Sequence, residues 1–289
     1  MYHINPSGIA LIQSLNVKRI KTFGDLAQDF IQCQLSCFSR VVCLVDVFDI
    51  YDLELSIKSA ERDRRSTSCL SRKVFQVIEG RPIPDWKKFL GVDTNKQDLL
   101  QFPGKSIVEH HDQSPRKMSA EDTLFLAGVC NDPITVKKIC SEGVSDYPEL
   151  CCTHEEADTR MLLQVIRADR MFGEKRTKGR IIVKSPDTDV LVLCVHYFPS
   201  LQYTDELWFQ MGAISSTKDG RRFIPVHDIC NSIDPVICKI LPAVHAVTGC
   251  DTTSSMFGIG KRTVFKVLKD RPSDFIDLSS LAHCDRINL

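Results

Sequence analysis

Three continuous apolar runs rich in β-branched residues constrain the fold of this chain more than any other feature. They occupy residues 41–48, 180–185 and 190–197. An apolar run without polar alternation is typical of a strand buried on both faces of a parallel sheet. Helical apolar periodicity occurs at residues 23–35, 155–172 and 233–240, the last leading into 244–247. Strands that alternate with helices predict an α/β layer architecture with right-handed crossovers.

Composition excludes several classes of protein. Of the 289 residues, 43% are hydrophobic and 26% are charged, values close to those of globular domains and unlike those of disordered or fibrous chains. The apolar runs are far shorter than the ~20 residues that a membrane-spanning helix needs. Residues 1–6 also lack the basic and apolar segments of a secretory signal. We therefore expect an intracellular protein with no membrane partner.

Thirteen cysteines are scattered along the chain without a CxxC pair. An odd and irregular set is typical of reduced thiols in a protein interior rather than of a disulfide framework. Cys33 and Cys37 are four residues apart, and Cys151 and Cys152 are adjacent, but neither pair has a second pair at zinc-finger spacing. We expect free cysteines and no structural zinc.

Charge is balanced over the whole chain, with 37 basic and 37 acidic residues. Any nucleic-acid partner must therefore be held by local clusters of positive charge. Two such clusters occur, at residues 58–73 and 174–184. We expect both to flank an acidic centre, where they would bind phosphates beside it.

Acidic residues gather where the predicted strands end and where one predicted helix begins. Six carboxylates form this set: Asp49, Glu156, Asp158, Asp187, Asp189 and Asp251. The carboxyl ends of parallel strands form the ligand crevice of open α/β sheets, so we expect the six to converge there. Their mutual repulsion would raise their pKa values unless cations neutralise them.

Divalent cations are the natural counter-charge for this set. Carboxylate oxygens are hard ligands of the kind that Mg²⁺ prefers, and Mn²⁺ accepts the same ligands. Two such ions about 4 Å apart activate water and stabilise the leaving oxygen in phosphodiester hydrolysis. His245, by contrast, lies in an apolar helical pattern and is interpreted as a core histidine with no role in the site.

Four ordered pieces of the chain resemble the flap endonuclease and XPG-type nuclease superfamily. They are VFD at 47–49, EAD at 156–158, SPDTDVLVL at 185–193 and TGCDTTSSMFGIGKRTVFK at 248–266. Each is similar to a family motif: the first strand end with a metal ligand, the "EAE" helix start, the "DxD" segment, and the last metal-binding Asp with its helix-two-turn-helix. The overall sequence also resembles that of transposon-associated or domesticated animal proteins that carry this domain.

The resemblance implies a single PIN-like nuclease-type domain over residues 1–289, three-layered, with a mainly parallel central sheet. It places an insertion at residues 67–146, in the position of the family's helical arch or gateway, and a C-terminal helix-two-turn-helix at residues 248–269. The implied activity is Mg²⁺-dependent (or Mn²⁺-dependent), structure-selective endo- or exonucleolytic cleavage of DNA at branches or duplex/single-strand junctions. A nuclear rather than cytoplasmic location follows, and protein partners stay open.

The resemblance also assigns roles to basic residues and glycines. Lys58 and Arg65 match the catalytic Lys and Arg at the base of the arch. DNA contacts are implied for Arg62, Arg64, Gly258, Gly260, Lys261 and Arg262. In the family, the Gly-x-Gly turn presents backbone N–H groups to duplex phosphate.

One departure from the family pattern concerns its first strand, which carries another metal-binding Asp. Residues 8–13 have the small-then-apolar pattern of that strand, and Ser7 stands where the acid is expected. A hydroxyl there lowers the negative charge of the site by one and weakens or abolishes metal binding.

Two alternative functions stay open. One is a catalytically degenerate module of the same fold that binds nucleic acid or protein. The other is a Mg²⁺ phosphatase of another α/β fold, which explains the acids but not the glycine turn.

Overall fold

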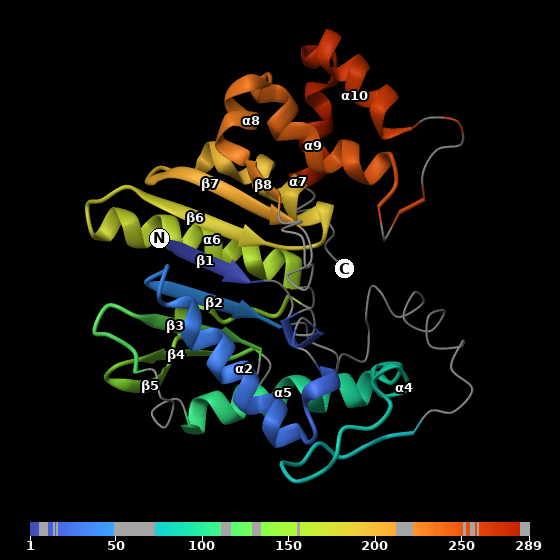
Figure 1. The fold of residues 1–289 in the computed structure, drawn as a ribbon. Coiled ribbons are helices and arrows are strands. Elements are labelled where there is room, and N and C mark those ends of the chain that lie inside the picture. The colour runs from blue at the N-terminus through green and yellow to red at the C-terminus, as the bar shows by residue number, and fades with distance from the viewer. Residues whose placement is uncertain are drawn as a thin grey trace.

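Eight strands form one central sheet in the computed structural model of this chain (Figure 1). The structure describes residues 1–5, 11–13, 15, 17–48, 73–110, 117–128, 134–154, 157–211, 222–250, 253–254, 258 and 260–283. The order across the sheet is β5-β4-β3-β2-β1-β6-β7-β8. The strands are β1 (Tyr2–Asn5), β2 (Cys43–Val47), β3 (Thr123–Ala127), β4 (Val136–Cys140), β5 (Gly143–Asp146), β6 (Gly179–Lys184), β7 (Thr204–Met211) and β8 (Arg222–Pro225).

The five central strands are parallel, and the three outer ones are antiparallel to their neighbours. Parallel pairing joins β3 to β2, β2 to β1, β1 to β6 and β6 to β7. Strands β4 and β5 continue the sheet antiparallel on one side, and β8 does so on the other. The expected α/β class with a mainly parallel sheet is therefore confirmed.

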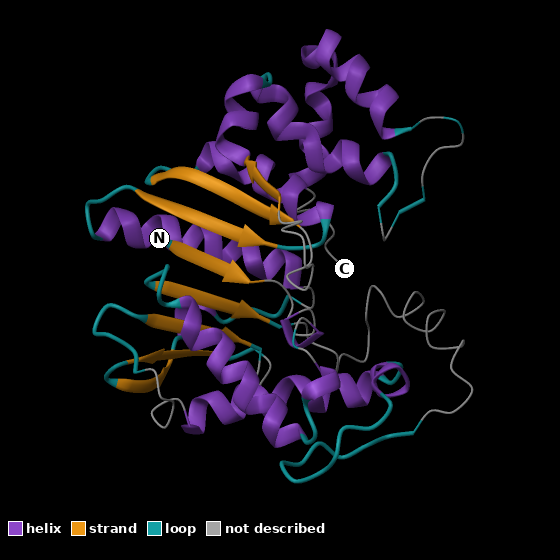
Figure 2. Cartoon of the chain, in the orientation of Figure 1, coloured by secondary structure: helices purple, strands orange, loops and turns teal. Residues whose placement is uncertain are grey.

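Helices cover both faces of the sheet (Figure 2). They are α2 (Phe23–Cys37), α4 (Trp86–Leu90), α5 (Asp93–His110), α6 (Ala157–Glu174), α7 (Thr188–Tyr197), α8 (Val226–Ser232), α9 (Pro235–Val247) and α10 (Lys261–Asp270), with 3-10 turns η1 (Val17–Arg19), η3 (Pro148–Leu150), η4 (Phe198–Ser200) and η5 (Pro272–His283). Among the described helices, none combines the length and apolar character that a membrane span requires.

Two apolar cores separate the layers. On one face, Met161 and Val165 of α6 belong to the same buried cluster as Ile4 of β1 and Val183 of β6. On the other face, α2 and α5 pack against β2, β3 and β4. Strands β2 and β3 supply alternate residues to both cores and are buried on both faces, as the continuous apolar run at 41–48 requires, whereas β1, β6 and β7 supply residues to the first core.

Two of the three predicted strands are confirmed, and the third is wrong. Strand β2 lies within the run at 41–48 and β6 overlaps the run at 180–185, but the run at 190–197 lies in helix α7. The side chain of Asp187 caps this helix by accepting a hydrogen bond from the Asp189 backbone N–H at 2.9 Å. The predicted helices at 23–35, 155–172 and 233–247 correspond to α2, α6 and α9.

The expected first strand is also misplaced. The first strand of the structure is β1, Tyr2–Asn5, which pairs with β2 on one side and β6 on the other. Residues 11–13, expected within the strand at 8–13, are helical. Ser7, assigned to the missing acid on the basis of that strand, lies outside the described residues. The small-then-apolar pattern was misleading because β1 is short and alternates apolar with polar side chains.

The segment at 67–146, interpreted as an insertion, is continuous with the sheet where the structure describes it. It supplies β3, β4 and β5 as well as α4 and α5. Strand β3 pairs with β2 in parallel register, Thr123 opposite Cys43. This segment therefore completes one side of the sheet.

The described cysteines are free thiols, as expected. Cys43, Cys194 and Cys238 are buried among apolar side chains of the α6 face. Burial raises the pKa of Cys43 and of Cys194 to about 12. These thiols are small core residues.

A buried carboxyl group interrupts the apolar centre of the sheet. Asp46 of β2 is fully buried, and its register partner Asn5 donates a hydrogen bond from Nδ2 to Oδ1 at 2.8 Å. Oδ2 has no hydrogen-bond partner within the described part of the chain. Burial raises the pKa of Asp46 to about 7, against the lowering effects of Asn5 and Lys184. Burial, aided by Lys184, lowers the pKa of His3 to about 4.

These two shifts give stability contributions with opposite pH dependence. The raised pKa of Asp46 contributes stability below pH ~4 that is lost as the pH rises through 7. The lowered pKa of His3 contributes stability above pH ~6.5 that is lost as the pH falls through 4. We predict that, relative to the native chain, His3→Gln becomes more stable as the pH falls from 6.5 to 4.5. Asp46→Asn becomes less stable over the same range.

Urea unfolding of both variants and the native chain at pH 4.5, 5.5 and 6.5 measures this. Each slope is limited to about 1.4 kcal/mol per pH unit for one titrating group. Parallel pH profiles for the two variants would show that neither group titrates as its burial requires.

Candidate active site

The carboxyl ends of the central strands gather candidate site residues at one edge of the sheet. Figure 1 shows β1, β2, β6 and β7 pointing the same way, with the first turns of α6 and α7 at the edge where these strands end. Asp158 lies in the first turn of α6, and Asp187 and Asp189 lie at the start of α7. The structure therefore brings these three predicted ligands to the same edge.

The turn from β6 into α7 fixes the two aspartates. The Oγ of buried Ser185 accepts a hydrogen bond from the Asp187 N–H at 3.1 Å, and Asp187 Oδ1 accepts from the Asp189 N–H at 2.9 Å. Both carboxylates are half-buried. Asx geometry of this kind satisfies backbone donors that the first helical turn leaves open. The cap thus orients the Asp187 side chain before any ligand binds.

His245 is the partner of Asp189. Its Nε2 lies 2.7 Å from Asp189 Oδ1, and its Nδ1 lies 3.2 Å from the Nζ of Lys261. An ammonium group can only donate, so Nδ1 accepts and the ring proton is on Nε2, where it is donated to Asp189. The interpretation of His245 as a core residue without a role in the site is therefore incomplete. Its apolar helical neighbours gave no signal of this contact.

A buried arginine holds the end of β2. Arg160 of α6 is 1% exposed, and its Nη1 donates to the backbone carbonyl of Phe48 at 2.6 Å. Phe48 directly precedes Asp49 in the chain. Beneath the guanidinium lies Gly128 at φ +92°, where an added Cβ would be 2.7 Å from Arg160 Nη1. An arginine in an amphipathic helix gave no sequence signal of this role.

The glycine turn and the start of α10 present positive charge. Gly258 has φ +76°, Gly260 is the N-cap of α10, and Lys261 and Arg262 are exposed. A pocket of about 300 Å³ lies between α9 and α10. It is lined by the polar side chains His245, Lys261 and Arg262 and by the apolar Leu241, Val244 and Phe265.

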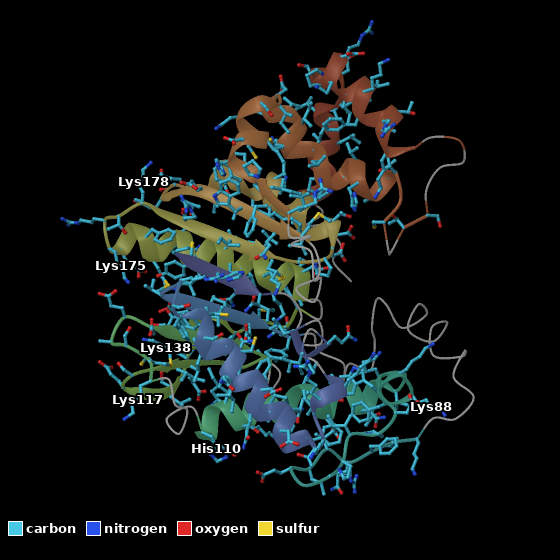
Figure 3. All side chains as sticks on the ribbon, viewed as in Figure 1. Lys88, His110, Lys117, Lys138, Lys175 and Lys178 are labelled. Carbon is cyan, nitrogen blue, oxygen red and sulfur yellow. The ribbon has the colours of Figure 1, made fainter. Side chains whose placement is uncertain are left out.

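Most of the second basic cluster, at 174–184, does not flank the acidic residues as expected, although Lys184 ends β6 at their edge of the sheet. Lys175 and Lys178 lie at the opposite edge of the sheet, where the parallel strands begin (Figure 3). Lys178 pairs with Asp205 at 3.0 Å, and Arg180 pairs with Glu206 at 2.8 Å. These cations form exposed ion pairs with β7 instead. The error arose because a strand separates its two ends by its full length.

Half of the predicted ligands fall outside the described residues. These are Asp49, Glu156 and Asp251, and with them the basic residues Lys58, Arg62, Arg64 and Arg65. Within the ranges that the structure describes, no group of three or more histidine, cysteine or acidic side chains could hold a metal ion. Asp158, Asp187 and Asp189 would therefore need the remaining predicted carboxylates to complete a site.

The described carboxylate oxygens are suitable ligands for a hard cation such as Mg²⁺. Asp187 and Asp189 each use Oδ1 for a hydrogen bond within the protein. In the described part of the chain, the second oxygen of each accepts no hydrogen bond. An oriented carboxylate with one uncommitted oxygen is a suitable ligand for Mg²⁺.

Comparison with protein-family models, curated proteins and solved structures finds no match for this chain. Its function is therefore inferred from its residues and their geometry.

A substitution at Gly128 tests how closely the Arg160 guanidinium packs against the backbone there. We predict that Gly128→Ala destabilises the protein by at least about 1 kcal/mol more than Gly143→Ala, because the guanidinium must shift away from the Phe48 carbonyl. Gly143 is a matched control, since it has φ +125° but nothing within 4 Å of an added Cβ. Positive φ alone costs on the order of 1–3 kcal/mol in both variants. Urea unfolding measures the difference, and equal destabilisation would contradict the close contact.

Proposed function

We propose that this chain is a metal-dependent nuclease of PIN-like fold that hydrolyses phosphodiester bonds in DNA. The observation that carries the proposal is the pair Asp187 and Asp189, which the turn after β6 orients at the carboxyl edge of a parallel sheet. Asp158, at the start of α6, reaches the same edge. Open α/β sheets bind their ligands at this edge.

In this proposal the six predicted carboxylates hold two Mg²⁺ or Mn²⁺ ions. The ions supply water activation and stabilisation of the leaving oxygen. Asp187 and Asp189 provide oriented oxygens on α7, and Asp158 with Glu156 provides oxygens on α6. Asp49 and Asp251 complete the set.

Positive side chains hold the nucleic acid in this proposal. Lys58 and Arg65 bind the scissile phosphate, and Arg62 and Arg64 bind the backbone beside it. At the other side, the turn at Gly258 and Gly260 approaches duplex phosphate, with Lys261 and Arg262 as its cations. Such contacts position a duplex without reading its sequence, which suits selection of branched or junction DNA by shape. A nuclear location and an arch formed within residues 67–146 belong to the same proposal.

A second candidate is a binding module of the same fold that has lost catalysis. The observation that favours it is that Oδ1 of both Asp187 and Asp189 is already engaged by protein donors. Each commitment reduces the number of oxygens left for a cation. The basic pocket beside α10 would bind nucleic acid equally well in such a module.

Asparagine substitutions separate the two candidates. Asn caps a helix about as well as Asp, so Asp187→Asn with Asp189→Asn removes charge and preserves the fold. We predict that this double variant loses Mg²⁺ affinity and cleaves branched DNA more slowly by on the order of 100-fold or more, because metal affinity rises with ligand charge. Calorimetric Mg²⁺ titration and a cleavage assay measure the two effects.

Asp234→Asn is the matched control for this experiment. Asp234 caps α9 in the same way, accepting from the Val236 N–H at 2.8 Å. It should retain metal binding and cleavage. If the native chain binds DNA but neither binds Mg²⁺ nor cleaves, the binding module is correct. Equal cleavage by the native chain and the double variant would sink the metal assignment.

A salt titration tests the role of α10 in nucleic-acid binding. We predict that Arg262→Gln weakens duplex binding and reduces the slope of log K against log salt by about 1, because one phosphate contact is lost. Arg271→Gln, at the other end of α10, should leave the slope unchanged. Fluorescence anisotropy over a range of KCl concentrations measures both slopes. Identical slopes for the two variants would remove the start of α10 from the interface.

A further inference from the structure

Three side chains from three helices form a continuous hydrogen-bonded row. Asp189 of α7 accepts from His245 of α9 at 2.7 Å, and Lys261 of α10 donates to the other nitrogen of the same ring at 3.2 Å. His245 is largely buried, with 13% of its side chain exposed, whereas Asp189 is 32% exposed. Lys261 is exposed and lies at the rim of the pocket between α9 and α10. The row therefore joins a candidate metal ligand to a candidate phosphate ligand through one rigid ring.

Because of the direction of its hydrogen bonds, this row responds to a ligand at either end, at Lys261 or at Asp189. An ammonium group has three N–H donors, so Lys261 can bind a phosphate oxygen while one donor stays on His245 Nδ1. That contact fixes the proton on Nε2, which is the donor that Asp189 needs. The last turn of α9 is closed by Thr248, whose Oγ1 donates to the carbonyl of Val244 at 2.7 Å.

We infer that His245 is a positioning residue that couples phosphate binding at Lys261 to cation binding at Asp189. A phosphate bound to Lys261 restrains the lysine side chain, and the lysine in turn restrains the His245 imidazole. The imidazole holds Asp189 Oδ1, which leaves the second oxygen of Asp189 to bind a cation. By linkage, a cation on Asp189 tightens phosphate binding by the same factor. The inference rests on the proposed function, because it needs a cation and a nucleic acid at this edge.

The coupling is measured as a ratio of affinities. We expect the Kd of the native chain for flap DNA to fall by about five-fold or more when Ca²⁺ is added, the lower bound of typical couplings. Ca²⁺ takes the same oxygen ligands as Mg²⁺, and gel analysis verifies that the DNA stays intact. Calorimetric Ca²⁺ titration with and without the DNA should return the same factor.

Two substitutions of His245 each remove one half of the row. His245→Gln places an amide donor where Nε2 lies and leaves no acceptor for Lys261. His245→Asn places an acceptor where Nδ1 lies and leaves no donor for Asp189. Both should reduce the coupling to less than two-fold. Only the Gln variant should keep the native Ca²⁺ affinity measured without DNA.

Lys261→Met breaks the row from its exposed end, where folding is not at risk, and should abolish the coupling as well. His196→Gln is the matched histidine control, since His196 of α7 contacts the Cys238 carbonyl of α9 at 3.1 Å and touches no acid among the described residues. Lys269→Met, at the last turn of α10, is the matched lysine control. Both controls should keep the native coupling.

The outcomes separate the inference from the function on which it rests. If the native chain binds Ca²⁺ and DNA with no coupling, or if the Gln, Asn and Met variants keep the native factor, the inference fails and the proposed nuclease stands. If the native chain binds neither Ca²⁺ nor DNA, the proposed function itself is overturned, and the coupling with it.

Discussion

A single buried guanidinium ties α6, which packs on the sheet through an apolar cluster, to the end of β2. Arg160 is almost fully enclosed, and its Nη1 donates a hydrogen bond to the backbone carbonyl of Phe48 at the end of β2. Removing such a charge from water costs several kcal/mol unless hydrogen bonds in a fixed geometry compensate it. Small shifts of α6 along the sheet would break that geometry. The helix start that carries Asp158 is therefore held in register with the end of β2, and Gly128 is needed because no side chain fits beneath.

A second local constraint acts where β6 meets α7. Helices begin with backbone donors that lack partners, and here Ser185 and Asp187 satisfy two of them. The same capping fixes the orientation of the carboxylate. Local structure and candidate chemistry thus share the same atoms, which explains why a short motif can specify both. The shared use also has a consequence for affinity, because an oxygen given to the backbone is not available to a ligand.

Sequence patterns predicted the helix and sheet layers of this protein better than the secondary structure of its individual segments. The central strand at 41–48 was recognisable because both of its faces are buried. The strand at 180–185 was recognisable from its β-branched residues, of which Ile181 and Val183 enter one core. The run at 190–197 has the same apolar character for another reason: α7 contacts α6, α8 and α9 as well as β7, so it lacks a polar face. The Asx cap at Asp187 was the signal that could have distinguished helix from strand.

The candidate site was predictable only where it depends on local sequence. Asp187 and Asp189 stand next to a strand end, and the structure places them there. His245 and Arg160 act over long distances in the chain, and each lies in an otherwise ordinary helical pattern. Such contacts follow from the packing of α9 on α7 and of α6 on the sheet, which single-sequence periodicity does not encode.

The central position of β1 has a consequence for how the chain is made. Tyr2 pairs with Cys43 on one side but with Ile181 on the other. At synthesis rates of about 5–20 residues per second, roughly 7–28 s separate the emergence of β2 from that of β6. During that interval β1 presents an open edge, and open edges invite pairing with other chains. The short length of β1 and its polar His3 and Asn5 limit that hazard on the ribosome.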